Sequence, residues 1–387
     1  MILLHEPNLK GKEKKYLKEC INTNWISTSG KFINLFEKKI CEYTKSKYAV
    51  LVNSGTSALH ISLLLSNVKS GDEVIVPTIS FIAPINAIKY CKAEPVFMDV
   101  DNHLNLDVEK TILFLKNETF SRNGFTFNKK SKKKISAIIV VHVFGNLINL
   151  KPLVKLCKKM KIDLIEDAAE SLGSYYTYFK KKKHAGTIGK FGCLSFNGNK
   201  IITCGGGGAI LTQNKILADK ARYFVTQAKD DPIKFVHKNV GYNYKMTNLH
   251  ASVGIAQIEK INKILNKKKK ITSVYSNFIS KIPGIEFISP PSNCVVNNWI
   301  NLIKIKKNYY NSGIEKLIKI FSLNNIQVRP VWYPNHLQAP YKRNQRYKIV
   351  KAKKLVESIL CLPSSATLKN SQIKKITNIL KRYQKTY

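Results

Sequence analysis

Short apolar runs alternate with amphipathic stretches between residues 48 and 213, and this alternation constrains the fold more than any other feature of the chain. The runs are rich in β-branched residues and are bounded by Gly, Pro, Asp or Asn. Because they are apolar on both faces, they predict buried strands of a mostly parallel sheet. The seven runs cover residues 48–52, 74–76, 95–98, 137–141, 164–165, 193–196 and 209–211.

The segments between these runs have helical spacing. Before the first run, for example, apolar side chains recur at Phe32, Leu35, Phe36, Ile40 and Tyr43. Strands that alternate with amphipathic helices are typical of an α/β wound sheet, here of about seven strands. The polar, Lys-rich stretch 117–134 is expected to be a solvated excursion between a helix and a strand.

A second region follows the wound sheet. After Thr247 a long helical pattern runs past the lysines 267–270, and further apolar runs appear at 299–305 and 326–328. We therefore expect two domains: a large α/β domain at 1–255, which includes an N-terminal substrate loop, and a smaller C-terminal α+β domain at 256–387.

The chain is strongly basic, with Lys+Arg 65 against Asp+Glu 24 and a net charge of +41. Such a charge first suggests nucleic acid as a partner. Only six residues are Arg, however, whereas phosphate and base recognition favours the bidentate fork of Arg. We therefore interpret the Lys excess, beside abundant Ile and Asn, as compositional drift. No nucleic-acid partner is expected, although Lys can hold the phosphates of a small substrate.

The eight cysteines include no CxxC pair, so neither a zinc site nor a disulfide framework is indicated, and no metal is expected. No apolar run approaches the roughly 20 residues of a membrane span. The first eleven residues lack the basic flank and apolar core of a signal peptide. The expected location is the cytoplasm.

The first candidate site is Asn53-Ser54-Gly55-Thr56-Ser57, which lies between the run 48–52 and an expected helix at 58–65. Free amides at a helix N-terminus, together with hydroxyls and a glycine, form an anion pocket. The alternative is an ordinary helix N-cap with a tight turn. The motif alone favours the alternative.

The second candidate is the acidic segment Asp163-Leu164-Ile165-Glu166-Asp167-Ala168-Ala169-Glu170. Its acids stand at the carboxyl end of a strand, which is the crevice side of a wound sheet. A buried carboxylate is costly unless it faces a cation or hydrogen-bond donors. Asp167 opposite a protonated pyridine nitrogen is one explanation, and an acid that caps the following helix is the other.

The third candidate is Gly192-Cys193-Leu194-Ser195-Phe196-Asn197-Gly198-Asn199-Lys200, followed by four glycines at 205–208. A lysine in a loop just after a strand can lie in a low-dielectric cleft. Its pKa then falls from about 10.4, which frees the amine for Schiff-base chemistry. The glycines allow close approach of the backbone to a bound group, although alone they also suit a flexible turn.

These motifs together resemble a known family. Ser54-Gly55-Thr56, Glu166-Asp167-Ala168-Ala169, and Ser195-Phe196 with Lys200 four residues later resemble, in order and spacing, the DegT/DnrJ/EryC1/StrS sugar aminotransferases. The resemblance covers nearly the whole chain and implies the aspartate-aminotransferase fold (fold type I) with pyridoxal phosphate as cofactor. Segments 141–146 and 196–202 look most like the legionaminic acid branch, which aminates nucleotide-linked 4-keto-6-deoxy-N-acetylglucosamine.

The resemblance also implies roles for single residues. Lys200 would form the Schiff base and later move a proton between cofactor and sugar, and Asp167 would keep the pyridine nitrogen protonated. Phe81 would stack on the ring or, equally, be a core aromatic, and His142 would lie near the ring edge or be a core histidine. The other implied cofactor contacts are Gly55, Thr56 and Ser195 at the phosphate, Glu170 near the phenolic oxygen, and Asn243 from a second subunit.

Substrate contacts are implied for the N-terminal loop at 24–27 and for the C-terminal element Arg329-Pro330-Val331-Trp332 with His336. Lys245 departs from the family pattern, which usually has Arg after Gly-Tyr-Asn-Tyr, and an ammonium does not reproduce a bidentate fork. Packing is an equal alternative for Trp332. The implied substrate set is Trp25, Lys31, Lys245, Arg329, Trp332 and His336.

We therefore expect a transaminase that takes nitrogen from L-glutamate and passes it to C4 of a UDP- or GDP-linked 4-keto-6-deoxy-N-acetylglucosamine. Since the family's site lies between two subunits, a homodimer with shared active sites is expected. The alternatives are a GDP-perosamine-type or a 3-keto sugar substrate, a regulator that only binds pyridoxal phosphate, and a basic nucleic-acid binder. The presence of both Lys200 and Asp167 argues against the regulator.

Overall fold

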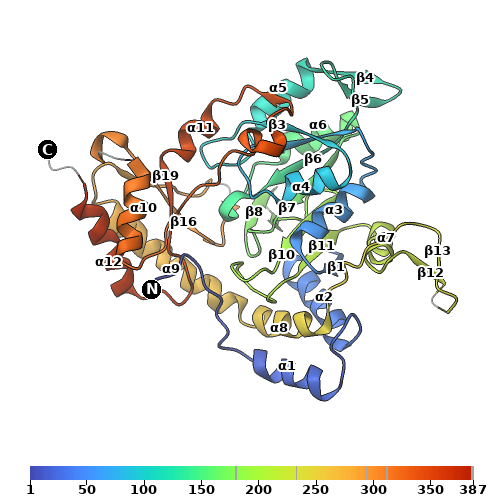
Figure 1. Cartoon of the computed structure of the whole chain (residues 1–387), viewed down its shortest axis with the longest axis horizontal. Helices are drawn as coiled ribbons and strands as arrows, with labels where there is room; N and C mark the ends of the chain where they lie inside the picture. The colour runs from blue at the N-terminus through green and yellow to red at the C-terminus, as the bar shows by residue number, and fades with distance from the viewer. Residues whose placement is uncertain (179–180, 232, 293, 311–312, 385–387) are drawn as a thin grey trace.

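The centre of the computed structural model is a twisted eight-stranded sheet (Figure 1). The structure describes residues 1–178, 181–231, 233–292, 294–310 and 313–384. The strand order is β1-β11-β10-β7-β6-β2-β3-β18. These strands are β1 (Tyr48–Val52), β2 (Glu73–Pro77), β3 (Glu94–Met98), β6 (Ile135–Val141), β7 (Asp163–Asp167), β10 (Phe191–Ser195), β11 (Gly208–Thr212) and β18 (Arg346–Tyr347).

All seven predicted runs are strands of this sheet, and the prediction that it is mostly parallel is confirmed. Strands β10, β7, β6, β2, β3 and β18 pair in parallel, whereas β11 runs antiparallel to both of its neighbours, β1 and β10. The sequence did not indicate the eighth strand. Strand β18 is two residues long and includes the exposed Arg346, so it carries no apolar run.

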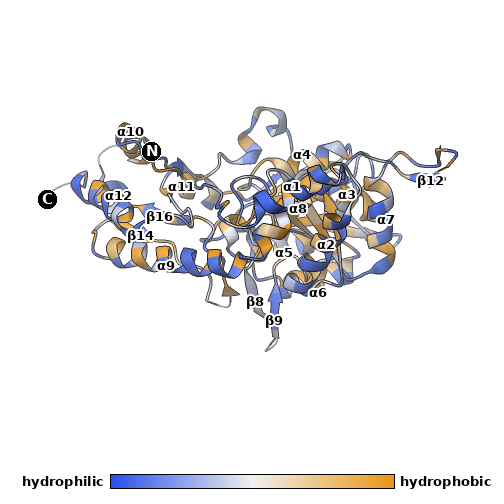
Figure 2. Ribbon diagram, turned by 90° about the horizontal axis from the view of Figure 1, so that it is seen from below, coloured by the Kyte–Doolittle hydropathy of each residue, from blue (hydrophilic) through white to orange (hydrophobic). Residues whose placement is uncertain are grey.

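Helices cover the sheet with their apolar faces (Figure 2). Helix α3 packs against β10 and β11, and its Ala58, Leu59 and Ile61 are buried. Helix α2 buries Phe32 and Phe36 as its spacing predicts, while Leu35 on the same helix faces solvent. The helices of this region are α1 (Glu13–Asn22), α2 (Lys31–Thr44), α3 (Gly55–Leu65), α4 (Ala83–Tyr90), α5 (Val108–Asn117), α6 (Lys151–Met160), α7 (Lys215–Val225) and α8 (Asn248–Ile258).

The C-terminal region contains a second hydrophobic core, built on a four-stranded sheet of order β14-β16-β19-β17. The helical pattern after Thr247 is two helices, because α8 ends at Ile258 and α9 begins at Ile261. The domain boundary at 255–256 stays a prediction. The C-terminal elements are α9 (Ile261–Ile279), β14 (Ile285–Phe287), β16 (Asn301–Ile305), α10 (Gly313–Leu323), β17 (Arg329–Pro330), α11 (Lys351–Val356), β19 (Ile359–Leu362) and α12 (Asn370–Arg382).

Small sheets complete the fold. The stretch 117–134, expected to be a solvated excursion, contains a β-hairpin whose Thr119, Thr126 and Asn128 are buried. Among the residues that the structure describes, no helix has both the length and the apolar character needed to cross a membrane. The remaining elements are β4 (Thr119–Arg122), β5 (Phe125–Asn128), β8 (Tyr175–Tyr178), β9 (Lys181–His184), β12 (Lys229–Asp231), β13 (Val236–His237), β15 (Cys294–Val295), and the 3-10 turns η1 (Val143–Gly145), η2 (Lys307–Tyr309), η3 (Asn335–Leu337) and η4 (Ala339–Tyr341).

Candidate active site

A cavity of about 780 Å³ lies at the carboxyl ends of β7 and β10, where the wound sheet meets the C-terminal region. Ligands of wound sheets bind at this edge, because the strand ends and helix N-termini converge there. Of the fourteen residues predicted to contact cofactor or substrate, nine line the cavity. They are Gly55, Thr56, Phe81, Asp167, Glu170, Ser195, Lys200, Arg329 and Trp332.

The N-terminus of α3 forms one end of the cavity. Ser54 caps this helix, and its Oγ accepts a hydrogen bond of 3.0 Å from the Ser57 amide. A Cβ at position 55 would lie 2.9 Å from the Ser195 Cβ, so this close approach of the two segments requires glycine. The amides of a first helical turn have no carbonyl four residues earlier in the helix and attract an anion. The N-cap and the anion pocket therefore coexist.

Lys200 enters the cavity from the loop that follows β10. The turn is fixed by two backbone hydrogen bonds, from the Lys200 amide to the Asn197 carbonyl at 3.0 Å and from the Cys204 amide to the Phe196 carbonyl at 2.8 Å. The Lys200 Nζ donates to Glu170 Oε1 at 3.3 Å. Its side chain is 13% exposed, so the amine is sheltered but open to a ligand in the cavity.

Two buried carboxylates face Lys200. Asp167 Oδ1 accepts a hydrogen bond of 3.1 Å from the Ala169 amide, and burial raises the pKa of Asp167 despite that bond and the Lys200 charge. Burial likewise raises the pKa of Glu170 to about 7, although Lys200 and the Phe144 amide, 2.8 Å from Glu170 Oε2, oppose the shift. In the protein without a ligand, the positive charge near these two carboxylates is too small to offset the effect of burial on their pKa values.

This arrangement fits pyridoxal phosphate. An anionic phosphate suits the α3 N-terminus, and a protonated ring nitrogen supplies the cation that the buried Asp167 lacks. The Lys200 amine is within the same cavity. Phe81 also lines it and is 58% exposed, which excludes the alternative of a core aromatic and leaves the ring free to stack on a planar ligand.

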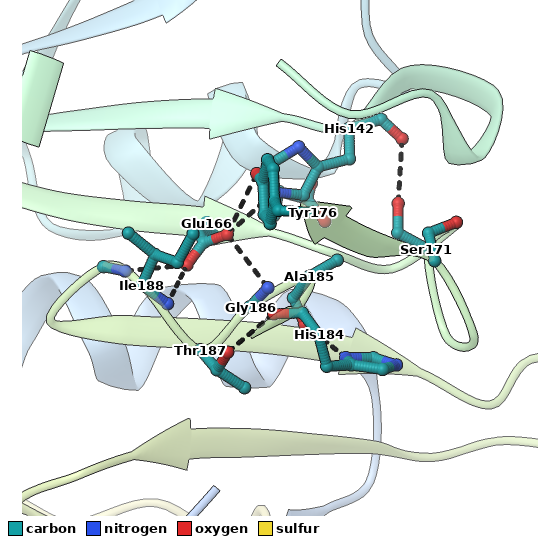
Figure 3. Close-up of polar contacts among 12 residues, drawn as sticks. His142, Glu166, Ser171, Tyr176, His184, Ala185, Gly186, Thr187 and Ile188 are labelled. Atoms are coloured by element: carbon teal, nitrogen blue, oxygen red, sulfur yellow. Dashed lines mark hydrogen bonds and ion pairs between the residues drawn. The ribbon is translucent and has the colours of Figure 1, made fainter. Parts of the chain in front are cut away.

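A second polar cluster lies beside the cavity but outside it, around Glu166 (Figure 3). Glu166 is fully buried and accepts hydrogen bonds from His142 Nε2 at 3.0 Å and from the amides of Gly186, Ile188 and Gly189 at 2.7–2.9 Å. Burial by itself would raise the pKa of Glu166, but these donors outweigh it and hold the pKa below its usual value. His142 is buried and does not line the cavity, so the structure agrees with the alternative of a core histidine.

The predicted N-terminal substrate residues lie outside the cavity of their own chain. Trp25 is 56% exposed, and its carbonyl accepts a hydrogen bond of 2.7 Å from Asn248 Nδ2. The Asn248 amide donates to the Ser27 carbonyl at 2.6 Å, so α8 holds this loop. Lys31 begins α2 and forms an ion pair with Glu19.

The structure also places Asn243, Lys245 and His336 outside this cavity. The Asn243 carbonyl accepts a hydrogen bond of 3.4 Å from Asn53 Nδ2, and Lys245 pairs through its backbone with Val52. His336 is buried, and its Nδ1 is 2.6 Å from Thr78 Oγ1. Burial, then the charge of Arg346, lowers the pKa of His336.

Several cavity residues were missed by the sequence reasoning, chiefly His5, Trp299 and Phe144. Both ring nitrogens of His5 are buried without a hydrogen-bond partner, and burial, then Lys268 and Lys200, lowers the pKa of the imidazole well below its usual value. Trp299 is the first residue of the apolar run 299–305, and this run gave no indication of a cavity residue. No pattern in the sequence marks His5 or Trp299, because each reaches the cavity from a distant segment. Phe144 lies in segment 141–146 directly after β6, and the carboxyl end of that strand marks it as a candidate.

Comparison with known proteins agrees with a site for pyridoxal phosphate and shows the family. The model of the DegT/DnrJ/EryC1/StrS aminotransferase family matches residues 7–381. The chain is 35% identical to a GDP-perosamine synthase of Escherichia coli over 376 residues (96% of this chain, 95% of that protein). It is 33% identical to "Putative pyridoxal phosphate-dependent aminotransferase EpsN" of Bacillus subtilis over 385 residues (98% and 95%).

The fold agrees as well. The crystal structure of a DegT DnrJ EryC1 StrS aminotransferase from Brucella abortus superposes with a TM-score of 0.87 at 22% identity, over 97% of this chain and 96% of that one. The fold type I prediction is thereby confirmed, whereas these relatives do not single out the legionaminic acid branch. The chain belongs to the DegT/DnrJ/EryC1/StrS aminotransferase family and is a pyridoxal-phosphate-dependent sugar aminotransferase.

Proposed function

We propose that this enzyme transfers the amino group of L-glutamate to C4 of a nucleotide-linked 4-keto-6-deoxy-N-acetylglucosamine, giving 2-oxoglutarate and a 4-amino-4,6-dideoxy sugar nucleotide. The observation that carries the proposal is the convergence of Lys200, two buried carboxylates and the α3 N-terminus in one cavity. Pyridoxal phosphate, when bound, carries the amino group between the two substrates and acts as an electron sink.

The residues of the chain have distinct tasks in this proposal. Lys200 holds the cofactor and moves the proton to and from the reacting carbon, since its amine is the base inside the cavity. Asp167 keeps the ring nitrogen protonated. Gly55, Thr56 and Ser195 bind the phosphate, and Arg329, which is exposed at the cavity wall, offers a bidentate fork to a carboxylate or diphosphate.

A GDP-linked 4-keto-6-deoxy sugar without the acetamido group is the second candidate substrate. The observation that favours it is the 35% identity to a GDP-perosamine synthase over almost the entire chain. The two candidates share the same chemistry and differ only in the nucleotide and in the group at C2 of the sugar, so a direct comparison of substrates decides between them.

The test supplies the purified enzyme with pyridoxal phosphate, glutamate and, separately, three ketones: the UDP- and the GDP-linked acetamido sugar and the GDP-linked sugar without acetamido. Mass spectrometry of the sugar nucleotide reports amination. Lys200→Ala should lower turnover about 10²–10⁴-fold, which is the usual contribution of general acid–base catalysis. Lys38→Ala, at an exposed lysine of α2, is the matched control and should keep full activity. If no ketone is aminated by the wild type, both substrate proposals are wrong.

We also infer a homodimer in which Asn243 completes the partner's site. A hairpin formed by β12 and β13 projects from the body of the molecule (Figures 1 and 2). It carries the exposed apolar residues Ile233 and Phe235, and the exposed Val240 follows it. An exposed apolar patch of this kind favours burial against another protein surface. Asn243 follows this hairpin and lies outside the cavity of its own chain.

Subunit complementation tests the shared site. Lys200→Ala and Asn243→Leu chains, each weak alone, are co-expressed, and the mixed dimer is isolated with two different affinity tags. One of its two sites then combines an intact Lys200 with the partner's intact Asn243, so about half of the wild-type activity per dimer should return. A monomer by light scattering, or no recovery in the mixed dimer, would refute the shared site.

A further inference from the structure

Trp299 contacts the Lys200 loop at two points. Its indole Nε1–H donates a hydrogen bond of 2.7 Å to the carbonyl of Asn199, the residue directly before Lys200. Its ring centroid lies 4.3 Å from the Lys200 Nζ. One side chain therefore contacts both the peptide that carries Lys200 and the amine at the other end of that side chain.

Trp299 is itself held rigidly. The residue is 4% exposed, its amide donates to Asn297 Oδ1 at 3.0 Å, and its carbonyl accepts 2.9 Å from the buried Lys268 Nζ. The Asn297 Nδ2 in turn donates to the Glu170 carbonyl at 2.7 Å. The ring of Trp299 also stacks on Phe144, with centroids 6.0 Å apart and planes at 26°. A side chain fixed on this many sides can orient a flexible lysine, because little freedom remains to be lost.

We propose that Trp299 is a positioning residue for Lys200: its N–H fixes the peptide that leads into the lysine, and its ring face holds the lysine nitrogen and favours the protonated state of that nitrogen. A cation over an indole face is attracted by the ring quadrupole, most strongly when water is excluded. The proposal rests on the role assigned to Lys200 above, but it is independent of the identity of the sugar.

Other charged groups also act on the Lys200 nitrogen and must be kept constant. Glu170 is 3.3 Å away, and Asp167 and His5 interact with Lys200 through their charges or dipoles. Arg329 lines the same cavity. Since substitutions at position 299 leave all four groups in place, a change in the protonation of the nitrogen is assigned to the ring face.

The first experiment titrates the holoenzyme with pH and follows the violet absorption of the cofactor bound to Lys200, which reports protonation of the linking nitrogen. In Trp299→Leu, which removes the ring face, the midpoint should fall by about 0.4–1.5 pH units, from the usual strength of a cation–π contact. Trp299→Phe keeps a weaker face and should shift less. The matched control is Trp332→Leu, because Trp332 stacks on the other aromatic, Phe144, at 4.5 Å; its midpoint should stay at the wild-type value.

The second experiment separates the hydrogen bond from the ring face. Trp299→Phe loses the N–H and leaves the Asn199 carbonyl without this donor, so turnover should fall about fivefold to tenfold. The KM for glutamate should be unchanged, since the lysine, and not the substrate, is mispositioned. A structural role alone would lower stability without changing the pH midpoint.

Fluorotryptophan keeps the experiment decisive if Trp299→Leu does not fold. Fluorine weakens the ring face at nearly constant shape, so the midpoint should fall stepwise with each added fluorine. An unchanged midpoint in Trp299→Leu or in the fluorinated enzyme, or an equal shift in Trp332→Leu, overturns the proposal. If Lys200→Ala keeps the violet band, the role of Lys200 itself is wrong, and this outcome is distinguishable from failure at Trp299.

Discussion

Glu166 and Asp167 are consecutive residues of β7 and are both buried, yet they lie in chemically opposite environments. Because successive side chains of a strand point to opposite faces, one enters the cluster of Figure 3 and the other enters the cavity. Glu166 is surrounded by donors and its pKa lies below the usual value, whereas Asp167 has the Ala169 amide and its pKa lies above it. A carboxylate satisfied by the protein stabilises the fold, and one left short of positive charge is ready for a ligand.

The largest expected effect is a loss of stability when Glu166, the carboxylate that is fully hydrogen-bonded by the protein, is substituted. Glu166→Gln replaces one of the two acceptor oxygens by an NH2 group. In place of Oε2 this group points its N–H at the Gly186 amide, and in place of Oε1 it points at the Ile188 and Gly189 amides. The free energy of unfolding should fall by about 3–5 kcal/mol, as for a broken buried ion pair. Urea denaturation measures it, and turnover per folded molecule should be retained.

Asp163→Asn on the same strand is the control for that result. Its ion pair with Lys190 is 30% exposed on both sides, so the loss should be less than about 1 kcal/mol. Equal losses of unfolding free energy for the two variants would show that the hydrogen-bond donors around Glu166 contribute no more to stability than an exposed ion pair.

The equivalent change of an acid to its amide at Asp167 should lower turnover and leave stability unchanged. Asp167→Asn cannot hold a positive charge on the ring nitrogen, so turnover should fall about 100-fold, or about 2.7 kcal/mol in the barrier. Because burial raises the pKa of Asp167, a neutral amide should not lower the stability of the cofactor-free chain. Steady-state kinetics and urea denaturation are measured together. Loss of stability with normal turnover would reverse the assignment of the two acids.

The smallest effect is a pH dependence at Glu170. Its folded pKa of about 7 lies above its ordinary value of 4.5, so its contribution to stability is complete below pH 4.5 and is lost as the pH rises through 7. In the cofactor-free chain, the stability of wild type relative to Glu170→Gln should fall by about 2 kcal/mol between pH 5 and 6.5. Urea midpoints at several pH values check this, and a flat difference would contradict the raised pKa. Glu166, with its lowered pKa, loses stability in the other direction, on acidification.

Local patterns in the sequence predicted the parts of the site that lie on single strand–loop–helix units. The apolar run of β1 followed by Ser54 and Gly55 predicts a helix N-terminus at the sheet edge, and the run of β10 predicts the loop that carries Lys200. The structure brings these segments together because parallel strands end at the same edge. The seven core strands were also predictable from local patterns, because each is a short apolar run.

Long-range contacts were not predictable in this way. Trp299 reaches Lys200 from about a hundred residues later in the chain, and His5 reaches the same cavity from the N-terminal segment. Nothing in the composition of either segment distinguishes a cavity residue from a core residue. His336, by contrast, matched a family element but packs against Thr78 outside this cavity.

Periodicity and motifs of adjacent residues were enough to predict the α/β fold, the family and the cofactor chemistry, because each of these depends on short stretches of the chain. Three features are visible only in the folded chain: the opposite environments of Glu166 and Asp167, the contacts of Trp299 with the Lys200 loop, and the two-residue strand β18 at the edge of the sheet. The physical reason is that the charge state of a buried group depends on the donors around it, and those donors come from segments that only folding brings together.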